Sequence, residues 1–407
     1  MVVVVSRDEV VVTGLGAITP LGGDVASTWD GLLAGRSGIG SCTLDHVGTF
    51  AAGVMAVDPV AKLPRPQANQ LDRSQQAALV AAQEAWADAG SPDVDPERLA
   101  ASVGTGVGGM ASLLHEDDRL ERAGVRRVSP RTVPLLMPNA AAAAISIEFG
   151  ARAGVYTPVS ACASGAEALA WGARLIRAGE ADVVIAGGTD AAVTPIAVAG
   201  FQQARGLSRH PGDPADASRP FSADRNGFVL AEGAAVVVLE SAAHAHARGA
   251  RVHAVLAGSG IAADAHHMTA PSPEGTGQIS AMCRALAQAG LGAQAISHVN
   301  AHATGTVVGD AAEARAIREV LGRATVTAPK AATGHLFGGA GALEAVFSTL
   351  SLVHGVVPPV RTLSQEGADP LIGLDLVTDR RDLPQRAVLS NSFGFGGQNV
   401  SLVLARP

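Results

Sequence analysis

Residues 155–165 read VYTPVSACASG and join an apolar run to an alanine-rich stretch that continues to Gly179. The apolar, β-branched run is typical of a buried strand, and the small residues after it permit a tight turn into a helix. The pattern therefore places Cys162 at a helix N-terminus, where unpaired N–H groups favour a thiolate and can bind an oxyanion. A lone cysteine is more often a small buried apolar residue, so the role of Cys162 has to be inferred from motifs elsewhere in the chain.

The chain repeats this layout further on. Residues 327–335 read TAPKAATGH and also lead from a β-branched run into a helix rich in alanine and glycine. Apolar runs alternate with helical stretches along the whole sequence, which is the pattern of βαβ units. We therefore predict a duplicated α/β fold with an N-terminal half over residues 1–250 and a C-terminal half over residues 251–407.

The elements that the pattern predicts can be given by residue range. Buried strands are expected at Glu9–Thr13, Ala101–Val103, Tyr156–Val159, Asp182–Ile185, Val236–Glu240, Val252–Ala257, Ile296–Asn300, Val326–Ala328 and Ala387–Leu389. Helices are expected at Ser74–Gly90, Ala166–Ala178 and Ser241–Gly249. The polar stretch Ser208–Arg225, with three prolines, predicts a long surface loop.

Composition excludes several classes of function. The chain has 407 residues, is 47% hydrophobic and 16% charged, and carries a net charge of -7 with a single tyrosine, which argues against nucleic acid as a partner. The run Val2–Val5 meets charged residues at once and no apolar stretch reaches spanning length, so we expect neither a targeting segment nor a membrane span. Three cysteines without metal-like spacing predict no disulfides, no metal site and a cytoplasmic location.

Two glycine- and threonine-rich segments each carry a histidine directly after a predicted strand. The first is NAHATGT over residues 300–306, with His302, and the second is KAATGH over residues 330–335, with Lys330 and His335. Together with the segment around Cys162 these make three, and a fourth is NSFGFGG over residues 391–397. It also follows a strand and lets backbone N–H groups approach a ligand. Because α/β sheets place ligand sites at strand ends, these segments and Cys162 predict one shared site.

At these residues the chain resembles the β-ketoacyl-[acyl carrier protein] synthases, the condensing enzymes of the thiolase superfamily, and most closely the synthase II type. Four motifs in matching order carry the resemblance over nearly the whole length. It implies a duplicated thiolase-like fold whose core has five layers, α-β-α-β-α. It also implies an acyltransferase that performs decarboxylative condensation without a cofactor, on substrates carried by the phosphopantetheine of acyl carrier protein.

The resemblance assigns roles by position. It makes Cys162 the acyl-accepting nucleophile, His302 and His335 the decarboxylation pair, and Lys330 and Glu344 their supporting residues. The backbone N–H groups of Cys162 and Phe395 would form an oxyanion hole. The remaining assignments are phosphopantetheine binding by Thr304 and Thr306, and an acyl pocket lined by Val107, Phe201, Phe337 and Phe395.

These residue types suit the chemistry independently of the family name. A thiolate can accept an acyl group from a thioester and leave it reactive enough for a second attack. Loss of carbon dioxide from a malonyl thioester leaves an enolate, which two histidine N–H donors can stabilise. The resemblance adds the kind of condensation: two histidines resemble the elongating synthases, so we predict chain elongation in fatty acid synthesis.

Two alternatives stay open at this point. One is a ketosynthase of a type II polyketide pathway, paired with a homologous chain-length factor. The other is a non-catalytic chain-length factor itself, but such proteins generally replace the nucleophile, whereas this chain keeps Cys162 and both histidines.

The resemblance also predicts partners. Acyl carrier protein is acidic, so an acidic synthase needs a local basic surface to dock it. The residues that match such a surface are Lys62, Arg65, Arg126, Arg127 and Arg205, although ordinary solvated charge explains each of them equally well. We further expect a dimer, either of two identical chains or with a homologous chain-length factor.

Overall fold

The structure is a computed structural model that describes residues 9–407. The run Val2–Val5, for which we expect no targeting role, lies outside these residues. Among the helices of residues 9–407, none is long and apolar enough to cross a membrane.

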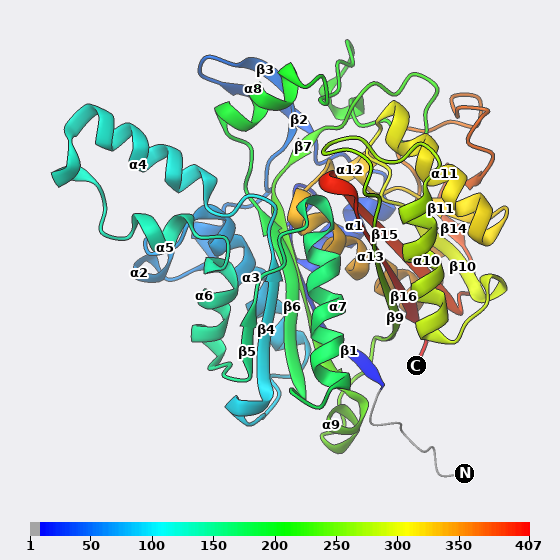
Figure 1. Cartoon of the computed structure of the whole chain (residues 1–407), viewed down its shortest axis with the longest axis horizontal. Helices are drawn as coiled ribbons and strands as arrows, with labels where there is room; N and C mark the ends of the chain where they lie inside the picture. The colour runs from blue at the N-terminus through cyan, green and yellow to red at the C-terminus, as the bar shows by residue number, and fades with distance from the viewer. Residues whose placement is uncertain (1–8) are drawn as a thin grey trace.

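The strands form one large sheet and two small ones (Figure 1). The large sheet has 11 strands in the order β13-β11-β10-β15-β16-β9-β1-β8-β6-β4-β5. Its strands are β1 (Val10–Ile18), β4 (Leu99–Gly104), β5 (Gly154–Tyr156), β6 (Val183–Asp190), β8 (Gly233–Ser241), β9 (Ala254–Ala263), β10 (Ile296–Asn300), β11 (Thr325–Thr327), β13 (Asp375–Leu376), β15 (Ala387–Gly394) and β16 (Gln398–Ala405). The small sheets contain β2 (Gly40–Leu44), β3 (Gly48–Gly53) and β7 (Leu230–Ala231), and β12 (Val356–Val357) with β14 (Arg381–Asp382).

The duplication predicted from the sequence is visible in the strand order. In the N-terminal half the order is β5-β4-β6-β8-β1, and in the C-terminal half it is β11-β10-β15-β16-β9. In both, the first three strands are parallel and the last two run antiparallel to their neighbours. Short pairing of β1 with β9 joins the halves, and the proposed boundary at residue 250 falls just before β9.

The helices supply the other layers. They are α1 (Val25–Leu33), α2 (Arg65–Ala68), α3 (Arg73–Asp88), α4 (Met110–Ala123), α5 (Thr132–Leu136), α6 (Ala140–Phe149), α7 (Ser164–Arg177), α8 (Pro195–Gln203), α9 (Ala242–Ala247), α10 (Thr276–Ala289), α11 (Val307–Leu321), α12 (Lys330–Thr333) and α13 (Ala340–His354). Helices α3 and α6 cover one outer face, α10 and α11 cover the other, and α7 and α13 lie between the two halves of the sheet (Figure 1). The predicted five-layered fold is thus confirmed.

The central layer explains why its helices are rich in alanine and glycine. A side chain at Gly165 would come within 2.6 Å of the carbonyl oxygen of Gly338, and one at Gly341 within 2.8 Å of the backbone nitrogen of Ala166. Helices α7 and α13 therefore approach each other closely only because these residues lack side chains. This approach brings the N-terminal ends of both helices to one place.

Two sequence-based expectations need correction. The strand expected at Tyr156–Val159 ends at Tyr156, because Pro158 has no N–H to donate to a sheet. The stretch Ser208–Arg225 is not a surface loop throughout, because its second part is buried and includes the fully buried Phe221. The backbone N–H of Phe221 donates to the carboxylate of Asp310, which anchors this segment inside the C-terminal half.

Candidate active site

Cys162 lies in a single 3-10 turn, Ala161–Ala163, directly before α7. The turn is tight: Ala161 has a φ of 51°, and a side chain at Gly394 would come within 2.5 Å of the carbonyl oxygen of Ser160. The strand end, the turn and the glycine opposite it therefore present a buried thiol at the start of a helix, where the sequence placed it.

The protonation state of this thiol differs from the sequence-based expectation. Burial raises the pKa of Cys162 to about 12, although the charge of Lys330 and the backbone N–H groups of Phe395 and Cys162 itself act to lower it. The helix N-terminus therefore does not make Cys162 a thiolate in the free protein, because loss of water around the sulfur outweighs it. Any reaction at the sulfur has to move the thiol proton.

Two histidines reach the same point from the C-terminal half. His302 follows β10, and His335 follows α12. One ring nitrogen of each and the sulfur of Cys162 all lie within 4.8 Å of one another. The two rings meet edge to face, with their centroids 5.4 Å apart. The convergence predicted for these three residues is therefore present.

Lys330 and Glu344 form a buried ion pair behind His302. The ammonium of Lys330 contacts the carboxylate of Glu344, donates to the carbonyl oxygen of His302 at 2.5 Å and lies 3.3 Å from its Nδ1. Because an ammonium can only donate, Nδ1 of His302 has to accept, and the ring proton resides on Nε2. Lys330 thus leaves His302 as a donor on its other side.

Both histidines are neutral. Burial holds the pKa of His302 well below its usual value, and the positive charge of Lys330 and the proximity of the His335 ring add to this effect. Burial and Lys330 lower the pKa of His335 in the same way. Neither ring nitrogen of His335 has a hydrogen-bond partner among the described residues. A neutral imidazole with a free N–H, placed beside a thiol, is suited to donating to a bound oxygen atom.

A cavity of about 710 Å³ opens over these groups. Its lining contains Cys162, His302 and His335, together with the residues predicted to bind substrate: Val107, Phe201, Phe337, Phe395, Thr304 and Thr306. The hydroxyl oxygens of the two threonines are 3.2 Å apart. The rings of Phe201 and Phe337 stack at 5.3 Å, and Phe395 lies nearer the solvent, with 42% of its surface exposed.

A cysteine and two histidines are also donors that zinc accepts. Within residues 9–407 these three form the one cluster with suitable spacing for a metal ion. The ammonium of Lys330 faces Nδ1 of His302 and opposes a second positive charge there. The donors are therefore better suited to an anionic intermediate, and the expectation of no metal stays a prediction.

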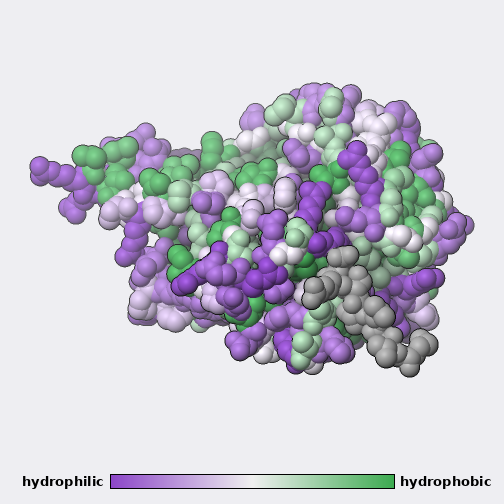
Figure 2. Space-filling model, turned by 60° about the horizontal axis from the view of Figure 1, so that its bottom comes forward, coloured by the Kyte–Doolittle hydropathy of each residue, from purple (hydrophilic) through white to green (hydrophobic). Residues whose placement is uncertain are grey.

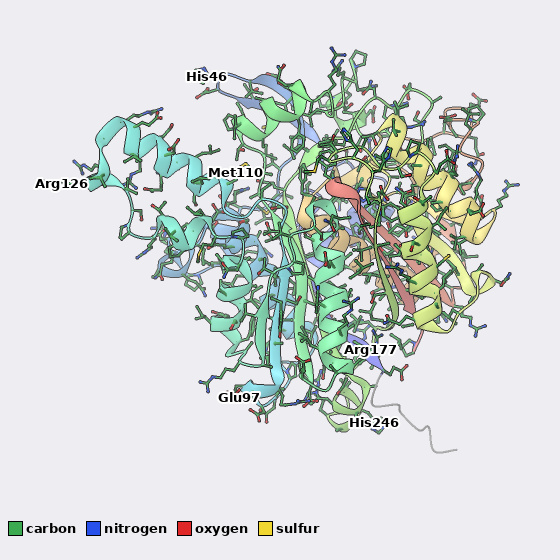
Figure 3. All side chains as sticks on the ribbon, viewed as in Figure 1. His46, Glu97, Met110, Arg126, Arg177 and His246 are labelled. Carbon is green, nitrogen blue, oxygen red and sulfur yellow. The ribbon has the colours of Figure 1, made fainter. Side chains whose placement is uncertain are left out.

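The five residues predicted to dock the carrier protein do not all line the cavity. Arg205 lines the cavity, whereas Lys62, Arg65, Arg126 and Arg127 do not. Arg126 lies at the tip of an arm formed by α4 and α5, and Met110 lies at its base and lines the cavity (Figure 3). A carrier protein that touches all five residues would have to extend from the cavity mouth across this arm.

Sequence reasoning missed residues that hold the site together. The carboxylate of Glu313 accepts the backbone N–H groups of His302 and Ala303, at 2.8 and 2.7 Å. Asp264 accepts from the side-chain amide of Asn399 at 2.7 Å and braces the turn that contains Phe395. No motif marked these acids, because Glu313 binds backbone N–H groups, which carry no sequence signal, and Asp264 binds an amide from a distant part of the chain.

Comparison with known families decides what kind of protein this is. Residues 7–245 match the family model for the N-terminal domain of β-ketoacyl synthases, and residues 253–364 match that for the C-terminal domain. The chain belongs to the β-ketoacyl synthase family. The resemblance predicted from the motifs, and the condensing acyltransferase that it implies, are therefore confirmed.

Named relatives cover almost the whole synthase. This chain is 44% identical to 3-oxoacyl-[acyl-carrier-protein] synthase 2 of Mycobacterium tuberculosis, over 98% of this chain and 97% of the relative. It is 40% identical to the mitochondrial 3-oxoacyl-[acyl-carrier-protein] synthase of Arabidopsis thaliana, over 98% and 94%.

Solved structures show the same fold. A β-ketoacyl synthase from Burkholderia phymatum superimposes with a TM-score of 0.90 at 33% identity, over 98% of this synthase and 99% of that chain. A type II polyketide ketosynthase, AntDE, solved with its acyl carrier protein AntF, gives 0.90 at 28% identity, over 98% and 99%. The ishigamide ketosynthase/chain length factor gives 0.87 at 32%, over 99% and 100%.

Proposed function

We propose that this synthase elongates acyl chains carried by acyl carrier protein in fatty acid synthesis, with Cys162, His302 and His335 as the reacting groups. The observation that carries the proposal is the convergence of these three side chains within 4.8 Å in one cavity. Relatives at 40–44% identity that are named 3-oxoacyl-[acyl-carrier-protein] synthases support the substrate class.

In the first step, the sulfur of Cys162 attacks the carbonyl carbon of an acyl thioester, and the carrier thiol leaves. The thiol proton has to move as the bond forms, because burial raises the pKa of Cys162 to about 12. The neutral imidazole of His335 is the acceptor within reach, because Nε2 of His302 already carries its ring proton, and His335 can return the proton to the departing carrier sulfur. The backbone N–H groups of Cys162 and Phe395, which act on the sulfur, would stabilise the oxyanion of the tetrahedral intermediate.

In the second step, a malonyl thioester loses carbon dioxide. Nε2–H of His302 and a ring N–H of His335 would donate to the thioester oxygen, on which the enolate charge develops. No side chain has to take a proton in this step, so neutral histidines suffice. Lys330 keeps the donor nitrogen of His302 facing the cavity, and Glu344 balances the buried charge of Lys330.

In the third step, the enolate carbon attacks the acyl group on Cys162, a carbon–carbon bond forms and the sulfur leaves. The product is a 3-oxoacyl thioester that is longer by two carbons, and the departing Cys162 thiolate takes a proton from solvent to regenerate the thiol. Thr304 and Thr306 would bind the phosphopantetheine arm at the cavity mouth, and Val107, Phe201 and Phe337 would contain the acyl chain. This chemistry needs no cofactor beyond the carrier arm.

A dimer would cover apolar surface that the single chain leaves exposed. The arm exposes Leu113, Leu120, Val125 and Val133, and Figure 2 shows hydrophobic surface on it. The β5 edge of the large sheet exposes Val155. An unpaired sheet edge beside apolar side chains favours pairing with a second chain. We propose a homodimer that works in the cytoplasm, where its three free cysteines stay reduced.

The proposal can be tested by intact-mass analysis. The protein is incubated with carrier proteins that bear acyl groups of increasing length, and malonyl carrier protein is then added. The expected result is one acyl group on Cys162 that is lost, with release of carbon dioxide, when the malonyl donor arrives. Cys283→Ala is the matched control, because Cys283 is an exposed residue of α10.

The same experiment separates the polyketide alternative. A synthase of fatty acid synthesis should be acylated by straight-chain donors on its own. Acylation that appears only after a homologous chain is co-expressed would instead identify a ketosynthase that pairs with a chain-length factor. Decarboxylation with no acylation of Cys162 by any donor would contradict both.

A further inference from the structure

Asp190 is a fully buried carboxylate at the end of β6 that the chemistry above does not use. Its Oδ1 accepts the hydroxyl of Thr105 at 2.6 Å and the N–H of Val107 at 3.3 Å. Its Oδ2 accepts the N–H groups of Gly106 at 2.8 Å and Gly338 at 2.7 Å. One side chain therefore ties the turn after β4 to the turn after His335, across the two halves.

The two glycines make this arrangement possible. A side chain at Gly106 would come within 2.9 Å of Oδ2 of Asp190, and one at Gly338 within 2.8 Å. Both backbones reach the carboxylate only because they carry no side chain. The carboxylate is thus enclosed on both sides, and a longer acid at position 190 would displace at least one turn.

Both turns carry the walls of the active-site cavity. Val107 follows Gly106, and Phe337 precedes Gly338. Phe337 has a φ of 48°, a strained conformation for a bulky residue, and its ring stacks on His335 at 4.9 Å and on Phe201 at 5.3 Å. The N–H bond from Gly338 to Asp190 helps to hold Phe337 in that conformation, and so holds the ring that packs on His335.

We propose that Asp190 is a positioning residue of this synthase, which sets the acyl-pocket wall at Val107 and, through Phe337, the orientation of His335. The inference rests on the roles proposed for Cys162 and His335. Asp190 would then influence both substrates of the condensation through the residues it positions. These substrates are the acyl chain beside Val107 and the malonyl thioester beside His335.

The electrostatics agree with this position. Burial raises the pKa of Asp190 to about 6 despite its four hydrogen bonds, so it is ionised above that pH. Its negative charge is one of the groups that raise the pKa of Cys162, after the larger effect of burial. Removing the charge of Asp190 should therefore make the Cys162 thiol more reactive. This gain in reactivity distinguishes the loss of the charge from a general loss of structure.

Asp190→Asn is the decisive variant, because it keeps the shape but removes the charge and places an NH2 group against N–H donors. Malonyl decarboxylation should lose kcat by about ten- to a hundred-fold with little change in KM, because His335 is displaced. The ratio of kcat/KM between long and short acyl donors should change, because Val107 moves. Alkylation of Cys162 by iodoacetamide at about pH 8 should become about three-fold faster.

Thr105→Val is the matched control, since it removes one hydroxyl and leaves the charge of Asp190. It should shift the acyl-length ratio less and leave the alkylation rate of Cys162 unchanged. If Asp190→Asn fails to fold, the acyl-length ratio of Thr105→Val becomes the test. An unchanged ratio in that variant overturns the proposal. A folded Asp190→Asn with unchanged kcat, acyl-length ratio and alkylation rate also overturns it.

Failure of the proposed function would look different. Normal decarboxylation by His335→Ala would reject the role of that histidine. The acyl-length ratio and the alkylation rate of Asp190→Asn depend on the pocket wall and the thiol only, so they would still test Asp190.

Discussion

The ammonium nitrogen of Lys330 lies 3.3 Å from Nδ1 of His302 and contacts the carboxylate of Glu344 on its other side. All three side chains are buried. The lysine therefore links a charge-balancing acid to a histidine whose proton it directs toward the cavity. Burial raises the pKa of Glu344 to about 7, against the charge of Lys330, so the pair depends on both partners.

Lys330→Met should reduce malonyl decarboxylation by about a hundred-fold, because His302 loses the group that selects its Nε2–H tautomer. The same change leaves Glu344 buried without a partner, and such losses typically cost about 3–5 kcal/mol of folding free energy. The two effects can be separated with Lys330→Met/Glu344→Gln. That double variant should recover stability in chemical denaturation but not decarboxylation, and recovery of both would show that Lys330 acts on folding alone.

His302→Ala and His335→Ala should each slow decarboxylation by about a hundred- to a thousand-fold, since each removes one donor to the enolate oxygen. Acylation of Cys162 by the first substrate should persist in His302→Ala, because His335 remains to accept the thiol proton, and should slow strongly in His335→Ala. Release of carbon dioxide and the mass of the acylated protein measure the two steps separately. A normal rate of decarboxylation in either variant would reject the enolate mechanism.

Much of the fold and the centre of the site could be predicted because they rest on local patterns. The β-branched run, the small-residue turn and the alanine-rich helix around Cys162 are contiguous, and the same layout recurs before His335. The strand at Ile296–Asn300 was predicted with its observed bounds, and the helix at Ser74–Gly90 appears as Arg73–Asp88.

The rest could not be predicted, because it depends on contacts between distant segments. The raised pKa of Cys162 follows from burial, which a local helix-terminus argument cannot see. Phe221 is buried by an anchoring bond to Asp310, although the loop around it is polar. Asp190 ends an apolar strand, which is a weak signal that could have singled it out, but its partners come from two turns far away in the chain.

Cys162→Ala should abolish condensation, because Cys162 is the one cysteine among the described residues that line the cavity. Cys162→Gln should instead retain malonyl decarboxylation, since its amide resembles the acylated cysteine and leaves both histidines in place. Release of carbon dioxide without product formation, followed in parallel for the two variants, checks this difference. Condensation at the normal rate in the alanine variant would exclude Cys162 as the nucleophile.

Alkylation of Cys162 should stay slow at neutral pH and rise steeply as the pH increases. Burial raises the pKa of the thiol to about 12, so the thiolate fraction grows about ten-fold per pH unit throughout the accessible range. Peptide mass analysis after brief iodoacetamide treatment distinguishes Cys162 from the exposed Cys283 in the same sample. A rate that levels off below about pH 8 would show that the helix N-terminus prevails over burial after all.

The folded state should lose stability on acidification, in part through His298. This residue is fully buried in β10, with Nδ1 2.9 Å from the amide oxygen of Gln385, and burial lowers its pKa from 6.5 to about 4. The unfolded chain therefore binds a proton below pH 6.5 that the folded chain refuses until about pH 4. Stability is present in full above this window and falls as the pH drops through it.

His298→Gln tests this account, because its amide does not titrate and can still donate to Gln385. At about pH 5 the wild type should have lost about 2 kcal/mol more of its unfolding free energy, relative to neutral pH, than the variant has. Urea denaturation at the two pH values measures the difference, and buried carboxylates contribute equally to both proteins. An identical loss in wild type and variant would mean that His298 is protonated in the folded state, or that the unfolded chain does not gain the proton.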